Sequence, residues 1–94
     1  MNIPSTFMML GHKWTVEIIA KDDWPNDLDE VGSTDFARCK ITILEGPVGY
    51  MQQTFLHELL HAALKYMGRA RLDKDEEFID LLAGFMHQAL VTGE

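Results

Sequence analysis

Apolar and polar residues alternate in the first part of the chain, as they do in half-buried strands. Residues 6–10 and 13–20 are two runs of apolar, β-branched and aromatic side chains, and Gly11 and His12 lie between them. From Trp14 onward the second run has the period of two that is typical of a strand with one buried face. The pattern predicts a β-hairpin with a tight turn at Gly11 and His12.

A third strand is predicted after a long irregular segment. Aspartate, asparagine and proline residues in 22–27 favour turns and open a loop of roughly 15 residues. In residues 37–44 polar and apolar side chains alternate again, with Ile41 and Ile43 among the apolar ones. This alternation predicts a half-buried strand that ends before Gly46.

The second half of the chain has the helical period instead. Apolar side chains in residues 48–67 cover an arc of about 200°, and Gly68 is suited to end that helix. A second helix is predicted from Asp73, as its N-terminal cap, to about Val91. The order β-β-β-α-α predicts an α+β fold, in which a small antiparallel three-stranded sheet is followed by two packed helices.

Composition restricts the class of protein. With 94 residues, of which 47% are hydrophobic and 24% charged, the chain is expected to form a single globular domain over residues 1–94. Its 8 basic and 15 acidic residues give a net charge of −7, which opposes nucleic-acid binding. The single cysteine, Cys39, fits a reducing compartment, and no apolar run is long enough to cross a membrane. We therefore expect a soluble cytoplasmic protein with neither a nucleic-acid nor a membrane partner.

The helix over residues 48–67 contains the motif His57-Glu58-Leu59-Leu60-His61. Histidines four residues apart lie on one helix face, separated by about 40° and about 6 Å of rise, so both imidazoles can bind one metal ion. Glu58 lies about 100° from His57, beside a metal-bound water and not on the metal. The motif predicts a catalytic Zn²⁺ bound by His57 and His61, with Glu58 as the general base.

The surroundings of the motif favour a real site over a chance string, which would occur in roughly one such chain in a hundred. Between Thr54 and Lys65 the only side chains outside the apolar arc are His57, Glu58 and His61. Burying such groups without partners would be costly. A structural zinc site usually has four protein ligands and is rich in cysteine, which this chain does not supply.

The third ligand is expected from the second helix. On a helical wheel Glu76 borders the apolar face, so it can point across to His57 and His61. Asp80, one turn later, is available to hold the other ring nitrogen of a ligand histidine. Glu77 points further out and is the second candidate for the ligand.

Other side chains are weaker candidates. His87 lies about 16 Å along the same stripe and could bind the metal only if Glu76 does not, so a boundary position is expected for it. His12 is expected in the hairpin turn, with a smaller prospect of lining the cleft. Tyr50 and Tyr66 are the only tyrosines, and neither is assigned a role.

Together these motifs distantly resemble the small zincin-like metallopeptidases of phages and prophages, which are similar to the ImmA/IrrE-like zincins that cleave repressors. The resemblance covers residues 11–90 and is carried by the segments 11–16, 40–43, 53–62 and 75–79. It implies a minimal zincin fold, Zn²⁺, Glu76 as the third ligand and a protein or peptide substrate. For a phage-encoded chain it also implies the host cytoplasm.

Two functions are consistent with the motif. In a zinc metallopeptidase, an extended substrate would pair with the free edge of the strand at 37–44. Glu58 would then take a proton from the zinc-bound water and pass it to the leaving amine. The alternative is a non-catalytic, zincin-like module of a phage or prophage that binds metal and a partner protein without turnover.

Overall fold

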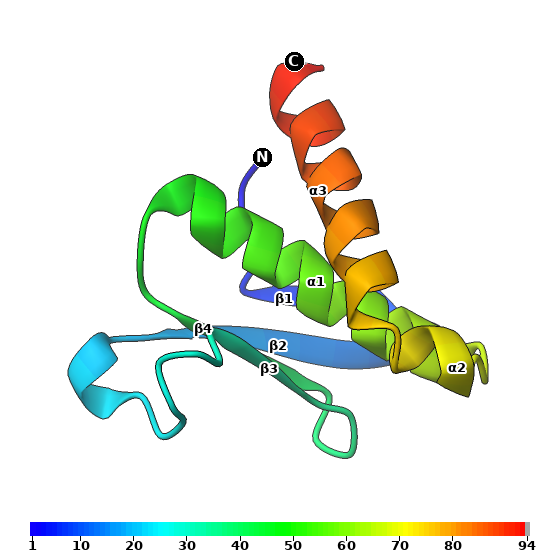
Figure 1. Cartoon of the computed structure of the whole chain (residues 1–94). Helices are drawn as coiled ribbons and strands as arrows, with labels where there is room; N and C mark the ends of the chain where they lie inside the picture. The colour runs from blue at the N-terminus through cyan, green and yellow to red at the C-terminus, as the bar shows by residue number, and fades with distance from the viewer. Residues whose placement is uncertain (94) are drawn as a thin grey trace.

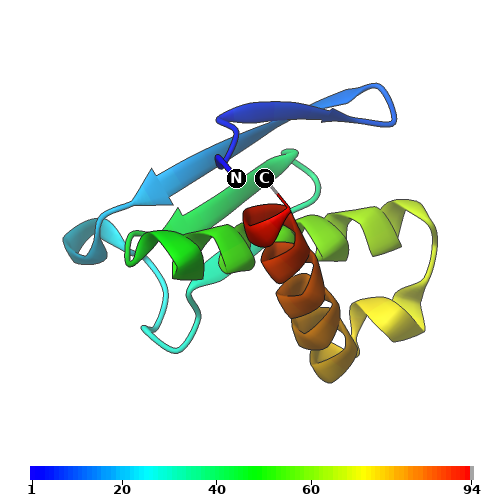
Figure 2. The same cartoon turned by 90° about the horizontal axis from the view of Figure 1, so that it is seen from above.

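The computed structural model describes residues 1–93 and has the expected α+β class, with a four-stranded mixed sheet and three helices. The strands, in chain order, are β1 (Thr6–Met9), β2 (His12–Ile19), β3 (Gly32–Asp35) and β4 (Lys40–Leu44). The helices are α1 (Val48–Tyr66), the short α2 (Ala70–Asp73) and α3 (Glu76–Thr92), and a 3-10 turn covers Lys21–Asp23. In Figures 1 and 2, α1 lies across one face of the sheet and α3 packs against α1.

The hairpin of β1 and β2 confirms the first part of the prediction. Its strands are antiparallel, with Phe7 opposite Trp14. The turn lies one residue earlier than expected, because Leu10 and Gly11 both have positive φ, of 48° and 81°. Positive φ at both central residues is typical of a type I′ turn, whose twist matches that of the strands. His12 is therefore the first residue of β2 and not part of the turn.

The prediction of a three-stranded antiparallel sheet was wrong in two respects. The strand order is β1-β2-β4-β3, and β2 runs parallel to β4, with Val16 opposite Ile41. A parallel pair needs a connection of a dozen or more residues, and residues 20–39 provide it. That connection contains the additional strand β3, which pairs antiparallel with β4 at the edge of the sheet.

The missed strand has an unusual composition. β3 reads Gly-Ser-Thr-Asp, without an apolar side chain, and glycine and aspartate are depleted in strands. Its backbone is paired by β4, and a side-chain hydrogen bond joins Ser33 to Thr42 on that neighbour. The expected strand at 37–44 is correspondingly shorter, because Cys39, with a φ of 52°, belongs to the turn that joins β3 to β4.

The bounds of α1 agree closely with the predicted helix, whereas the segment after α1 contains the additional short helix α2 and a later start of α3. α1 ends at Tyr66, and Gly68 follows with a φ of 70°, as expected of a glycine at a helix end. The helix predicted from Asp73 instead begins at Glu76, because the carboxylate of Asp75 accepts the Phe78 amide at 3.1 Å. Asp73 is the last residue of α2, and its side chain does not cap α3.

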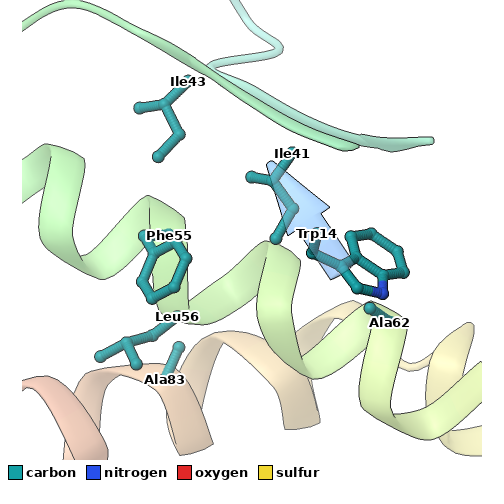
Figure 3. Packing of buried hydrophobic residues seen from close by; sticks show 7 residues of the cluster. All are labelled: Trp14, Ile41, Ile43, Phe55, Leu56, Ala62 and Ala83. Atoms are coloured by element: carbon teal, nitrogen blue, oxygen red, sulfur yellow. The ribbon is translucent and has the colours of Figure 1, made fainter. Parts of the chain in front are cut away.

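The core fixes the rotation of α1. Its fully packed side chains come from both layers: Trp14, Ile41 and Ile43 from the sheet, Phe55, Leu56 and Ala62 from α1, and Ala83 from α3 (Figure 3). With this face buried, the polar sector of α1 turns toward β3 and α3, as the contacts of Glu58 and His57 with those elements show. Within residues 1–93, no helix is both long and apolar enough to cross a bilayer.

Candidate metal centre

Three side chains predicted as ligands lie together at the junction of α1 and α3. His57, His61 and Glu76 each offer a ligand atom within 4.8 Å of the others. The Nε2 atoms of the histidines are 3.3 Å apart, and each lies 3.1 Å from one oxygen of Glu76. Ligands about 2.0–2.1 Å from a tetrahedral zinc would be about 3.3 Å apart. The observed spacing therefore fits a metal ion of that size.

Helix geometry and the connection after α1 bring these atoms together. His57 and His61 are one turn apart on α1, so both rings project to the same side. The chain then turns at Gly68 and through α2, and α3 begins with Glu76. Glu77, the second candidate, is not part of the cluster. The helical wheel thus oriented α3 correctly, although it started the helix too early.

Two further carboxylates hold the outer nitrogens of the histidines. The Nδ1 atom of His57 lies 2.7 Å from Asp80, the contact that the sequence predicted for that residue. The Nδ1 atom of His61 lies 2.7 Å from Asp73, which the sequence assigned to a helix cap. Each carboxylate accepts a hydrogen bond from the Nδ1–H group of its histidine, so each Nε2 presents its lone pair to the centre. Both rings are therefore held in the tautomer that a metal ligand needs.

Glu58 lies beside the cluster and faces it with one oxygen. Its Oε1 atom accepts a hydrogen bond from the Thr34 hydroxyl at 2.7 Å, and its Oε2 atom is 4.0 Å from Nε2 of His57. The residue is only 8% exposed, and this burial raises the pKa of its carboxyl. The Thr34 hydrogen bond and the nearby rings of His57 and His61 oppose that rise in pKa. A carboxylate of raised pKa is suited to accepting a proton near neutral pH.

A cleft passes the centre and follows β3. It consists of two adjoining cavities of about 460 and 400 Å³, and both are lined by Gly32, His57, Glu58 and Glu76. The first extends toward Phe36 and Asp73, the second toward Tyr50 and Asp80. This corrects the expected substrate edge, because β4 is paired on both sides and the sheet ends at β3.

The remaining histidines have structural contacts. His87 lies 2.9 Å from the Gln52 side chain, which in turn donates to the backbone oxygen of Met1 at 2.6 Å. His12 stacks on Tyr66 with ring centroids 5.6 Å apart. Neither histidine belongs to the metal cluster, in agreement with the boundary position expected for His87.

The two tyrosines differ in their relation to the cleft. The Tyr66 hydroxyl accepts a hydrogen bond from the Trp14 indole at 3.0 Å, on the core side of α1. Tyr50 is 55% exposed and lines the second cavity. Tyr50 therefore borders the cleft, although the sequence alone assigned it no role.

Comparison with known proteins provides no relative from which a function can be transferred. No protein family model matches the chain, and neither curated proteins nor solved structures give a significant match. The resemblance to phage zincin-like peptidases therefore stays a prediction. The function has to follow from the geometry and chemistry of the centre itself.

Proposed function

We propose that this chain is a zinc-dependent metallopeptidase of minimal zincin type. His57, His61 and Glu76 bind Zn²⁺, and Glu58 is the general base. One observation carries the proposal: three ligand atoms lie at zinc-like spacing, and a buried carboxylate stands beside them with one oxygen turned toward them. The resemblance noted above adds the expectation of a phage or prophage protein acting in the host cytoplasm.

The donor set favours zinc over the hard cations. Two imidazoles and one carboxylate are typical of catalytic zinc, whereas calcium and magnesium prefer sites made of oxygen ligands. Within residues 1–93, no fourth histidine, cysteine, aspartate or glutamate joins the cluster. A structural zinc site would normally be closed by four protein ligands, so three ligands beside a cleft support a catalytic site.

The protein's own residues provide the rest of the hydrolytic chemistry. Zinc, when bound, supplies a Lewis acid that acidifies water and polarises a carbonyl. Glu58 is placed to take the proton of the attacking water on Oε2 and to deliver it to the leaving amine. Asp80 and Asp73 keep the histidine rings in the ligand tautomer.

The substrate is proposed to bind along β3. β3 pairs only with β4, and its other edge borders the cleft at Gly32 and Thr34. An extended peptide can add to such an edge as a further strand, so that backbone hydrogen bonds bring a peptide bond to the centre. The two cavities that adjoin at the metal cluster leave room for side chains of the peptide.

The experiment compares the zinc-loaded chain with Glu58→Gln on a pool of unstructured, fluorescence-quenched peptides. We expect hydrolysis by the wild type, loss of hydrolysis on chelation, and zinc binding without hydrolysis in Glu58→Gln. Equal activity of the two proteins would remove Glu58 from the reaction. Zinc and peptide binding by the wild type without any cleavage would establish the alternative, a non-catalytic metal-binding interaction module.

A further inference from the structure

The edge strand touches the proposed base directly, and nothing in the hydrolytic scheme above uses this contact. We propose that β3 positions the general base: Thr34 is a positioning residue that holds one oxygen of Glu58, and Gly32 allows the strand to come close enough to do so. The inference rests on the proposed function, because it assigns Glu58 the role of base.

The single hydroxyl proton of Thr34 faces two acceptors of Glu58. Its hydroxyl lies 2.7 Å from Oε1 of the carboxylate and 3.0 Å from the backbone oxygen of the same residue. With Oε1 held by the strand, Oε2 is the oxygen turned toward His57, at 4.0 Å from Nε2. The two oxygens of the carboxylate therefore have different surroundings, one on the strand and one at the metal cluster.

Gly32 makes this close approach possible. A Cβ atom at position 32 would lie 2.6 Å from Cγ2 of Thr54, and 3.1 Å from both Cγ and Oε2 of Glu58. The first distance is shorter than real Cβ contacts allow, so any side chain here would push β3 away from α1. The requirement is for space and not for a special backbone angle. Glycine at position 32 thus brings Thr34 within hydrogen-bond distance of Glu58.

This arrangement keeps the base oriented throughout a proton transfer. When the carboxylate is ionised, Thr34 donates to Oε1; when Oε2 carries the proton, Oε1 still accepts the same hydrogen bond. A base held in this way loses little orientation between taking and giving the proton, and a displacement of about 1 Å can cost about 100-fold in rate. Because β3 is also the proposed substrate edge, one strand sets the positions of both substrate and base.

The test compares Thr34→Val, Thr34→Ser and the matched control Thr42→Val, each saturated with zinc. Thr42 lies on β4, and its hydroxyl forms a hydrogen bond with Ser33. Thr42→Val removes this bond, so the control deletes a neighbouring hydroxyl that does not touch Glu58. We expect Thr34→Val to lower kcat about 10- to 100-fold with KM and zinc affinity within about threefold of wild type. Thr34→Ser should restore kcat to within about threefold, and Thr42→Val should leave it unchanged.

A second measurement does not depend on activity. In the metal-free protein, the carboxyl carbon of ¹³C-labelled Glu58 should give the same resonance in wild type and Thr34→Ser, and a shifted or broadened one in Thr34→Val. An unchanged resonance and unchanged kcat in Thr34→Val would overturn the proposal, as would a Thr34→Ser variant no better than Thr34→Val. Thr34→Ala replaces Thr34→Val if the latter does not fold. A wild type without hydrolysis would instead refute the proposed function, and the resonance would then show only whether Thr34 holds the Glu58 carboxylate.

Discussion

Chelation of zinc should destabilise this fold strongly. The centre lies between α1 and α3, and its carboxylates repel one another when no cation is bound. The carboxylates of Glu58, Asp73, Glu76 and Asp80 all lie within 4.0 Å of a ring nitrogen of His57 or His61. With neutral imidazoles this group has a formal charge of −4, and a divalent cation halves it. We therefore expect zinc to bind the folded chain far more tightly than the unfolded one.

The size of the effect follows from linkage. Binding to the native state alone adds RT ln(1 + [L]/Kd) to the free energy of unfolding, which is about 4 kcal/mol when free zinc exceeds Kd a thousandfold. For a chain of this length, 1 kcal/mol shifts Tm by roughly 4–8 °C, so zinc should raise Tm by roughly 16–32 °C over the chelated protein. Thermal unfolding followed by circular dichroism, with zinc, with magnesium and with EDTA, measures this directly.

Two single variants sharpen the zinc experiment. Glu76→Ala should lose most of the zinc-dependent rise in Tm, since each tenfold loss of affinity removes about 1.4 kcal/mol. Glu77→Ala is the matched control: it removes the adjacent carboxylate outside the cluster and should change stability by no more than about 0.5 kcal/mol. The assignment would be refuted by equal Tm with zinc and EDTA, or by a larger loss of zinc response in Glu77→Ala than in Glu76→Ala.

Three further predictions concern the surroundings of the ligands. Asp73→Asn should weaken zinc binding about 10- to 100-fold, as loss of a carboxylate partner of a ligand histidine does; calorimetric titration checks this, and unchanged affinity would contradict the role of Asp73. Because burial raises the pKa of Glu58 above 4.5 in the folded state, the metal-free wild type should lose stability as the pH rises from about 4.5 through the folded-state pKa. The stability of Glu58→Gln minus that of wild type, measured by urea unfolding in EDTA, should therefore grow from about pH 4 to about pH 7, and a constant difference would argue against a raised pKa. Gly32→Ala should destabilise the fold by about 1–3 kcal/mol through overpacking. Gly46→Ala is the control and should be nearly neutral, because a Cβ at position 46 meets nothing within 4 Å. Equal effects of the two substitutions on stability would show that the contact of β3 with α1 is loose.

Local periodicity was enough to predict the part of the site that lies on helices. The spacing of His57 and His61 and the orientation of Glu76 and Asp80 are set by 3.6 residues per turn, and the structure has the contacts that this period implies. The start of α3 was predicted wrongly: Asp73 was expected to cap the helix, whereas Asp75, an equally suitable residue type, caps it in the structure. Only the tertiary contact of Asp73 with His61 separates their roles.

The sheet was predicted less well because its pairing is not a local property. Nothing in residues 12–19 or 40–44 specifies whether the two strands run parallel or antiparallel; the length of the connection between them permits either. The positive φ of Leu10 also has no signal in its residue type, since leucine rarely adopts that conformation.

β3, the strand that was not predicted from the sequence, is also the strand that contacts Glu58, the proposed base. The two facts have a common cause. A strand that approaches a buried carboxylate closely has to be small at Gly32 and must offer a hydroxyl at Thr34. These requirements remove the β-branched and aromatic side chains by which strands are usually recognised, and Thr34 alone keeps the β-branched type. Disagreement between local propensity and observed structure is expected where a segment serves a site more than the core. Within the segment 32–35, Gly32 is therefore where we expect a substitution to affect folding, and Thr34 is where we expect a substitution to affect catalysis first.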